Sequence, residues 1–170
     1  MEDYGGQLGV NTRLERMMEQ YGNDLLRICC VYLKDASMAE DAVQETFIKS
    51  YRHMASFRGD CSEKTWLVSI AVNTCRDMRR SAWFRYVDRS VDMEKLGIVA
   101  EPQEKRSPLL REIMALPRKQ MEVILLRYYA EMTQSEIAKL LSISEAAVSK
   151  RLARARNMLR CVLEGGEACE

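Results

Sequence analysis

Basic side chains gather near the C-terminal end of the chain. Residues 144–160 contain a single acid, Glu145, against five cationic side chains, which are Lys150, Arg151, Arg154, Arg156 and Arg160. Such clustered guanidinium and ammonium groups are the chemistry that binds nucleic-acid phosphates and base edges. Residues 34–45 show the opposite bias. Because the whole chain has 26 Lys and Arg against 25 Asp and Glu, it is not a uniformly basic coat, and only the local charge is informative.

A helix-turn-helix is predicted to position these cations, over residues 133–160. Thr133 and Glu136 have the spacing of a capping box at a helix start. A short apolar face follows, made by Ile137, Leu140 and Leu141. The sequence Ser-Ile-Ser at 142–144 provides a three-residue turn. In the second helix, apolar residues four and three apart form one inner stripe. They are Val148, Leu152, Ala155 and Leu159.

The remaining positions of the second helix are predicted to face outward and to contact DNA. A major groove admits one helix, whose N-terminal half reaches base edges while flanking cations meet phosphates. The candidate base readers are Ser149, Lys150, Ala153 and Arg154. The candidate phosphate contacts are Thr133, Gln134, Arg151 and Arg156. A merely solvated basic face is the alternative, but the capped short helix, the turn and the basic helix occur together, which favours DNA binding.

Three helices are predicted in the first half of the chain. The first has one apolar face with steps of three and four residues, formed by Leu14, Met17, Met18, Tyr21, Leu25, Ile28, Cys29 and Tyr32. The second begins at a predicted capping box of Ser37 and Glu40. It runs through Val43, Phe47 and Tyr51, with Asp41, Gln44 and Glu45 on its other side. The third starts near Ser62 and buries Leu67, Ile70, Ala71, Thr74 and Met78; its opposite stripe is Ser69, Asn73, Arg76 and Arg80.

The chain is predicted to be all-α, with two small helical domains joined by a flexible linker. The helical domains are placed at residues 10–82 and 109–164. Between them, residues 83–108 lose helical periodicity, and Gly97, Pro102 and Pro108 interrupt any helix. Order resumes with a helix over residues 109–116, breaks at Pro117, and continues as a strongly apolar helix to Tyr129.

Enzyme and metal chemistry find little support in the sequence. The six cysteines form no CxxC pair, and the single histidine, His53, lies eight residues from the nearest cysteine. No nucleophile, base and orienting acid share a suitable spacing, and no glycine-rich phosphate loop is present. We therefore expect no enzyme activity, no metal and no cofactor. The absence of a long apolar run or a signal peptide predicts a cytoplasmic protein with no direct membrane insertion.

Two stretches of the sequence together resemble one family. Residues 41–80, DAVQETFIKSYRHMASFRGDCSEKTWLVSIAVNTCRDMRR, resemble region two of the extracytoplasmic-function (ECF) sigma factors of bacteria. Residues 116–156, LPRKQMEVILLRYYAEMTQSEIAKLLSISEAAVSKRLARAR, resemble region four of the same family. The order and separation of the segments also agree, and the resemblance spans roughly residues 14–163. A helix-turn-helix alone occurs in many regulators, whereas the pair of segments is specific.

The resemblance implies a subunit that binds core RNA polymerase, directs it to promoters and helps to open the duplex. Region four would read the upstream −35 element. Region two would read the −10 element as a displaced single strand. The acidic and amide face of Asp41, Gln44 and Glu45 would then dock on the polymerase clamp helices. The resemblance also implies an anti-sigma factor that covers the polymerase-binding faces.

The same resemblance implies a pocket for a flipped base. Phe57 and Arg58, in the loop FRGDC, would shape the pocket and Asn73 would line it. Arg76, Arg79 and Arg80 would meet backbone phosphates, although a cationic helix end that complements its own dipole explains them equally well. A stand-alone helix-turn-helix regulator remains the competing function. It would bind duplex DNA tightly without polymerase.

Overall fold

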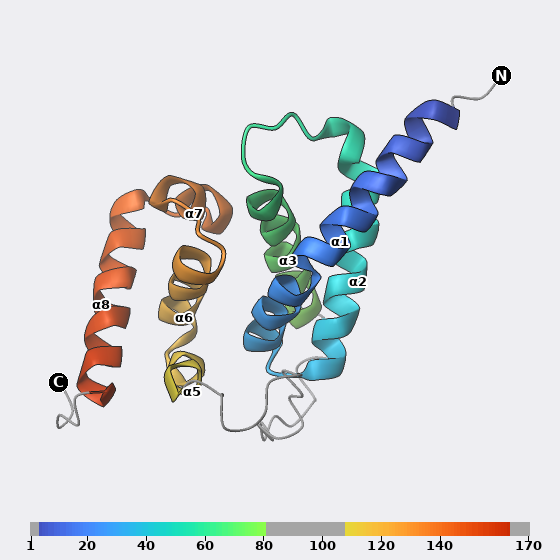
Figure 1. Cartoon of the computed structure of the whole chain (residues 1–170). Helices are drawn as coiled ribbons and strands as arrows, with labels where there is room; N and C mark the ends of the chain where they lie inside the picture. The colour runs from blue at the N-terminus through green and yellow to red at the C-terminus, as the bar shows by residue number, and fades with distance from the viewer. Residues whose placement is uncertain (1–3, 81–107, 164–170) are drawn as a thin grey trace. The chain divides into compact units, whose positions relative to one another are not determined.

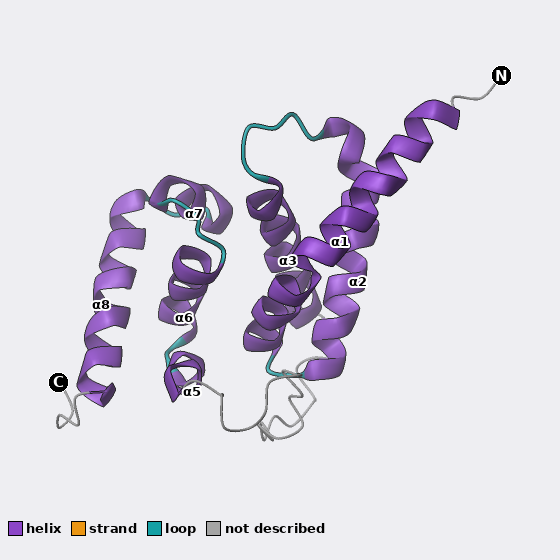
Figure 2. Cartoon of the chain, viewed as in Figure 1, coloured by secondary structure: helices purple, strands orange, loops and turns teal. Residues whose placement is uncertain are grey.

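The computed structural model describes residues 4–80 and 108–163. Within them every regular element is helical and no strand occurs (Figures 1 and 2). Contacts divide the chain into two units, residues 1–99 and 100–170, which are described separately below. The predicted all-α class is therefore confirmed. Residues 83–107 of the predicted linker lie outside the described residues.

Three long helices build the N-terminal unit. They are α1 (Tyr4–Leu33), α2 (Ala36–His53) and α3 (Glu63–Arg80), with a short 3-10 turn, η1 (Met54–Ser56), after α2. Each of the three packs against the other two, and α1 runs obliquely across its neighbours (Figure 1). A three-helix bundle encloses the core, whose side chains include Leu25, Ile28, Leu67, Val68 and Ala71.

The buried face of α1 largely matches the predicted stripe. Met17, Leu25, Ile28, Cys29 and Tyr32 are buried as expected. The helix begins earlier than predicted, at Tyr4. Met18 is a correction, because 46% of its surface is exposed. One position round the helix from buried Met17, it lies at the edge of the stripe and points into a surface groove.

The start of α2 differs from the prediction. Asp35 is the N-cap, and its carboxylate accepts a hydrogen bond of 2.9 Å from the backbone N–H of Met38. Ser37 lies inside the helix and is exposed, so the predicted capping box of Ser37 and Glu40 is wrong. The chain reverses at Lys34, with φ of 56°, and this places Asp35 first in line to cap the helix.

The inner face of α2 is made mostly of small side chains, with Phe47 as its one large residue. Its buried residues are Ala39, Ala42, Thr46, Phe47 and Ser50. Small side chains at these positions allow the neighbouring helix backbones to approach closely, which bulkier residues would prevent. Tyr51, predicted to follow Phe47 along the apolar side, is 37% exposed. Val43 is only half-buried.

Helix α3 begins as predicted. The Ser62 hydroxyl accepts a hydrogen bond of 3.0 Å from the backbone N–H of Thr65. Of the predicted inner residues, Leu67, Ala71 and Thr74 are buried, and Ile70 and Met78 are half-buried. The core face also takes in Val68, Val72 and Cys75.

The C-terminal unit contains α5 (Pro108–Ala115), α6 (Arg118–Ile124), a turn of π-helix η3 (Leu125–Tyr129), α7 (Gln134–Leu141) and α8 (Glu145–Leu163). Pro117 separates α5 from α6 as predicted. Pro108, expected to end the linker, is instead the first residue of α5. Proline is tolerated there because the first helical N–H needs no intrahelical partner.

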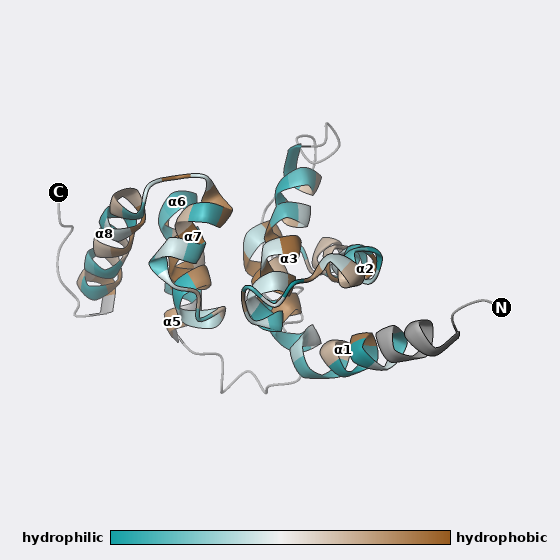
Figure 3. Ribbon diagram, turned by 90° about the horizontal axis from the view of Figure 1, so that it is seen from above, coloured by the Kyte–Doolittle hydropathy of each residue, from teal (hydrophilic) through white to brown (hydrophobic). Residues whose placement is uncertain are grey.

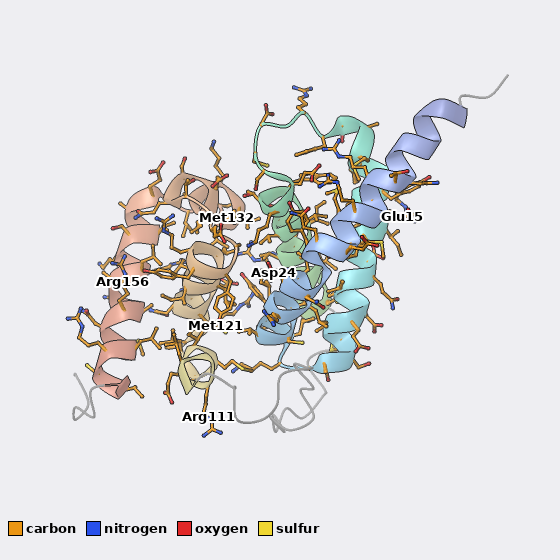
Figure 4. The ribbon with its side chains drawn as sticks, in the orientation of Figure 1. Glu15, Asp24, Arg111, Met121, Met132 and Arg156 are labelled. Atoms are coloured by element: carbon orange, nitrogen blue, oxygen red, sulfur yellow. The ribbon has the colours of Figure 1, made fainter. Side chains whose placement is uncertain are left out.

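Apolar side chains from α6, η3, α7, α8 and the segment between η3 and α7 form the core of the C-terminal unit. Met121, Leu126, Met132, Ile137 and Leu152 are each at most 2% exposed, and Figure 4 labels Met121 and Met132 in this unit. Tyr128 and Tyr129, predicted to belong to the apolar helix, are exposed. Among the helices of the described residues, none is long and apolar enough to cross a membrane.

Candidate nucleic-acid interface

The predicted helix-turn-helix is present at α7 and α8. The Thr133 hydroxyl accepts the backbone N–H of Glu136, and the Glu136 carboxylate accepts the backbone N–H of Thr133, so the capping box is complete. Helix α7 ends at Ser142, which takes a left-handed conformation with φ of 54°. The Ser144 hydroxyl then caps α8 by accepting the N–H of Ala147. The turn of residues 142–144 is thus fixed at both ends.

Helix α8 separates an apolar side from a basic side. Val148, Leu152 and Ala155 are fully buried and Leu159 is half-buried, as predicted. Most of the predicted DNA-contacting residues are exposed, namely Ser149, Lys150, Ala153, Arg154 and Arg156. Arg151 is half-buried. Figure 3 shows hydrophilic and hydrophobic residues alternating along α8, and Figure 4 labels Arg156 on it.

The start of α7 holds the remaining two predicted phosphate contacts. Thr133 is exposed, and its hydroxyl also donates to the Glu136 carboxylate at 2.8 Å. Gln134 is the first residue of α7 and is half-buried. Backbone N–H groups of a first helical turn attract anions, and at α7 the Glu136 carboxylate already accepts from the N–H and the hydroxyl of Thr133.

The predicted outer stripe of α3 is partly exposed to solvent and partly engaged by other residues of the chain. Asn73 and Arg80 are exposed, and Arg76 is half-buried. Arg80 pairs loosely with Asp77, at 3.8 Å. Arg79 is different, since its Nη1 donates to the backbone carbonyl of Tyr32 at 3.0 Å. Arg79 therefore contacts the end of α1, a role that differs from both the phosphate contact and the helix-dipole role predicted for these arginines.

The loop of residues 57–62 is anchored by its first residue. The ring of Phe57 stacks on Trp66, with centroids 4.7 Å apart and planes inclined by 27°. The Arg13 guanidinium lies over the Phe57 ring, 5.3 Å from the centroid. Asn73 follows Trp66 by seven residues on the same face of α3, about 10 Å along the axis. Phe57 and Asn73 are thus on one side of α3, two turns apart, while Arg58 is exposed in the loop.

The predicted polar face of α2 is also apolar in part. Asp41 and Gln44 are exposed, and Glu45 forms an ion pair of 3.7 Å with Lys49. Lys49 in turn donates to the Thr74 hydroxyl on α3 at 3.1 Å. Ile48, one turn after Gln44, is 46% exposed. This face is therefore polar at one end and apolar at the other.

An open groove of about 880 Å³ lies between α1 and α2. Gln44 and Ile48 of the α2 face also line the groove. Its apolar lining comes from both helices, mainly Leu14, Met18, Val43, Phe47, Ile48 and Tyr51. Gly22 lies on the α1 side, and a β-carbon added there would meet no atom within 4 Å. The groove explains why Met18 and Tyr51 are exposed although the sequence pattern predicts them to be buried.

Sequence reasoning missed a cluster that joins α1 to α3. Glu63 accepts hydrogen bonds from Arg13 at 2.9 Å and from Arg16 at 2.7 Å. Burial alone would raise the pKa of Glu63, but these two guanidinium groups outweigh it and hold that pKa below its ordinary value. The partners lie 47 and 50 residues apart in sequence, so no local pattern could indicate the contact.

Cysteines contribute no reactive or metal-binding constellation among residues 4–80 and 108–163. Cys29, Cys30 and Cys75 are free thiols buried in the N-terminal core, and Cys61 and Cys161 are half-buried. Within those ranges no three His, Cys, Asp or Glu side chains are grouped so that they could hold a metal ion. His53 is exposed near the end of α2.

Comparisons with known proteins identify both units. Residues 17–85 match the family model for sigma-70 region 2, and residues 106–159 match that for sigma-70 region 4. The ECF RNA polymerase sigma factor SigL of Mycobacterium tuberculosis is 32% identical, over 96% of this chain and 97% of SigL. The probable RNA polymerase sigma factor RfaY of Xanthomonas campestris is 31% identical over 89% of this chain, which spans 40% of that longer protein.

A solved structure has the same fold. CnrH, determined in complex with the cytosolic domain of CnrY, superposes with a TM-score of 0.66 and 24% sequence identity. The match covers 92% of this chain and 91% of CnrH. At this level of identity the comparison shows the fold of the chain.

Proposed function

This chain belongs to the ECF sigma factors of the sigma-70 family, and on that premise we propose how its two helical units divide the work of promoter recognition. As a sigma factor it directs RNA polymerase to promoters. The observation that carries the residue-level proposal is the basic outer face of α8, presented by a capped helix-turn-helix. Residues 109–164 are assigned to the −35 element, residues 10–82 to polymerase and the −10 element, and residues 83–108 to the linker.

The −35 element is read by α8 lying in the major groove. Ser149, Lys150, Ala153 and Arg154 face base edges, because the exposed side of the N-terminal half of such a helix enters the groove. Thr133, Gln134, Arg151 and Arg156 meet phosphates on either side. Ala153 is small, so it allows the helix to approach a base edge closely and favours an apolar contact such as a thymine methyl group.

The −10 element is read as a displaced strand by the loop of residues 57–62 and the outer stripe of α3. Phe57 and Arg58 shape one end of a pocket for an extruded base, and Asn73 supplies hydrogen bonds at the other. The Phe57 ring already contacts Trp66 and the Arg13 guanidinium, so Phe57 serves as a wall of the pocket. Arg76 and Arg80 meet the strand's phosphates.

Core polymerase docks on the face of α2 that bears Asp41, Gln44 and Glu45. Exposed carboxylate and amide groups suit a basic, helical partner surface, and the exposed Ile48 adds an apolar contact at the other end of the face. The neighbouring groove between α1 and α2 receives an apolar helix of an anti-sigma factor. Because Gln44 and Ile48 belong to both surfaces, a helix seated in the groove competes with polymerase.

A leucine at Gly22 tests this assignment of the groove. A β-carbon at this position meets no atom within 4 Å, so Gly22→Leu should place its side chain in the groove, and a non-glycine residue favours the helix. We expect inhibition by the anti-sigma factor to weaken at least tenfold while polymerase binding is retained. Equal loss of both would assign the groove to polymerase. The control variant is Arg27→Leu, on the exposed surface of α1. Gly59→Leu would not serve, because Gly59 has a left-handed φ of 79° that strains any other residue.

The proposal contains no catalytic step by this chain, whose sigma-factor relatives act through polymerase. It acts where promoter DNA and polymerase meet, in the bacterial cytoplasm. Run-off transcription with core enzyme, followed by mapping of the transcript starts, tests the function. Specific transcripts that require the added chain are expected. Duplex binding by the chain alone, with no stable polymerase complex, would instead indicate a stand-alone regulator.

A further inference from the structure

Four side chains form a closed ring of contacts around the start of the loop of residues 57–62. Glu63 binds Arg13, Arg13 covers Phe57, and Phe57 stacks on Trp66. Glu63 and Trp66 both belong to the first turn of α3, so the ring returns to the helix where it began. It therefore links α1, the loop and α3 through side chains alone.

Both ends of this loop are held by hydrogen bonds. The Phe57 N–H donates to the Met54 carbonyl at 3.2 Å, and Ser62 caps α3. Between these ends Arg58, Gly59 and Asp60 are exposed. Gly59 has a left-handed φ of 79°, a conformation that favours glycine and permits the sharp turn. How Phe57 is fixed thus sets the direction in which the loop leaves η1.

Arg13 is the second residue, beside Trp66, that contacts the ring of Phe57. Its Nε and Nη2 lie 2.9 Å and 2.8 Å from Glu63 Oε1, so its plane has one preferred orientation. The side chain of Glu63 is 19% exposed and also receives Arg16. Because Arg13 and Glu63 lie on α1 and α3, the loop is set by packing of the bundle before any DNA is present.

We infer that Arg13 and Glu63 are positioning residues that hold the loop of residues 57–62 ready to read the −10 base. The inference rests on the proposed role of the loop in base recognition. Neither residue needs to touch DNA. A loop that is already ordered loses less conformational entropy when the base enters, and it presents one geometry, which sharpens discrimination between bases. Removing either residue is expected to relax base preference.

A second ion pair between the same helices supplies the matched control. Lys64 Nζ lies 3.4 Å from Asp24 Oδ2, joining α3 to α1 beside the ring (Figure 4 labels Asp24). If Arg13 and Arg16 only held α1 against α3, breaking the ion pair of Asp24 and Lys64 would relax base preference to the same extent. If they position the loop, Asp24→Asn will leave base preference intact while Arg13→Leu and Glu63→Gln change it.

The experiment uses the full chain bound to core polymerase and single-stranded oligonucleotides of a promoter mapped by run-off transcription. The four bases are placed in turn at each −10 position, and the ratio of affinities for the best and the other bases is measured. We expect Arg13→Leu and Glu63→Gln to lower this ratio about tenfold, with less than a twofold change in polymerase affinity. An unchanged ratio in both variants, or an equal fall in Asp24→Asn, overturns the inference.

Wild-type behaviour separates failure of the inference from failure of the proposed function. If the wild-type holoenzyme shows no base preference on these strands, the proposed role of the loop is wrong. If wild type discriminates and the variants discriminate equally well, only the positioning role is wrong. The double variant Arg13→Leu/Glu63→Gln should be no worse than either single variant, because both break the same ring.

A measurement on the free chain guards against variants that fold poorly. The chain has two tryptophans, Trp66 and Trp83, and Trp83→Phe leaves Trp66 as the sole emitter. Acrylamide quenching of Trp66 should rise at least twofold in Arg13→Leu and stay unchanged in Asp24→Asn. Retained helical circular dichroism confirms folding. Equal quenching in wild type and Arg13→Leu would show that the loop is not held by Arg13.

Discussion

Thr133 and Glu136 hold each other at the start of α7. The Thr133 hydroxyl lies 3.2 Å from the Glu136 backbone nitrogen, and the Glu136 carboxylate lies 2.7 Å from the Thr133 backbone nitrogen. Each thereby satisfies an N–H that the first helical turn leaves without an intrahelical acceptor. The short helix α7, only eight residues long, depends on such a cap because its own hydrogen bonds are few.

Loss of this cap is expected to destabilise the chain by a measurable amount. Thr133→Ala and Glu136→Ala should each lower the free energy of unfolding by about 1 kcal/mol, measured by urea denaturation. Thr133→Ser should retain most of the stabilisation that the cap contributes. Only Thr133→Ala should in addition weaken binding to every duplex sequence, because Thr133 is the proposed phosphate contact. Wild-type denaturation midpoints in both alanine variants would contradict the structural role.

Arg154 offers the sharpest test of base reading by α8. Arg154→Ala should weaken recognition of the −35 element by about 1–3 kcal/mol, the range for a lost bidentate base contact. The loss is measured by competition between the mapped element and a scrambled duplex. Arg154 is exposed, so folding should be unaffected. Equal losses on both duplexes would assign Arg154 to a phosphate instead.

Asn73 separates strand opening from duplex binding. Because its side chain is exposed on α3, Asn73→Ala should leave the stability of the chain unchanged while reducing the yield of open complexes several-fold. Permanganate footprinting of unpaired thymines detects the opened strand, and duplex affinity is measured alongside. Asn11→Ala, an exposed asparagine on α1, is the control. Footprints equal to wild type in Asn73→Ala would refute the proposed contact.

Glu63 should make stability depend on pH. Its pKa is held below the ordinary carboxyl value in the folded chain, where Arg16 and Arg13 outweigh the effect of burial. The stabilisation is therefore present above the unfolded pKa, about 4.3, and is lost as the pH falls through the folded value. Glu63→Gln should cost about 0.5–1 kcal/mol at pH 7 and nothing at about pH 2. A difference independent of pH would contradict this; exposed Glu19→Gln is the control.

The cysteines should fall into two reactivity classes. Burial raises the pKa of Cys30 to about 11, and a hydrogen bond with Cys75 together with burial raises that of Cys29. These protonated, enclosed thiols should resist iodoacetamide at pH 7.5 until urea unfolds the chain. Cys61, half-buried in the loop, should be alkylated under native conditions. Peptide mapping by mass spectrometry checks the order in which the cysteines are alkylated. Labelling of Cys29 before Cys61 would contradict the prediction.

Local patterns in the sequence predicted the C-terminal unit well. The capping box, the three-residue turn and the inner stripe of α8 all depend on residues within four positions of one another. Short-range geometry of this kind is fully encoded in spacing. Even the exposed positions of α8 follow once the stripe of Val148, Leu152 and Ala155 is placed inside.

The N-terminal unit was harder because its decisive contacts are distant in sequence. Ser37 and Glu40 have the spacing of a capping box, yet Asp35 caps the helix because the chain turns at Lys34. Met18 and Tyr51 are apolar at helical spacing but line a groove that only the packing of α1 against α2 creates. The contact of Arg13 with Glu63 spans 50 residues. Tertiary packing, rather than periodicity, decides such features.

The hydrogen bond from Arg79 to the Tyr32 carbonyl also bears on the ionic-strength dependence of DNA binding. Each cation that neutralises a phosphate releases condensed counterions, and on a single strand this contributes a slope of about −0.7 to the logarithm of affinity against the logarithm of salt concentration. Arg79 directs one of its N–H groups to a carbonyl of its own fold, which leaves fewer of its donors available for a phosphate. Arg79 is therefore expected to contribute less to that slope than the exposed Arg80.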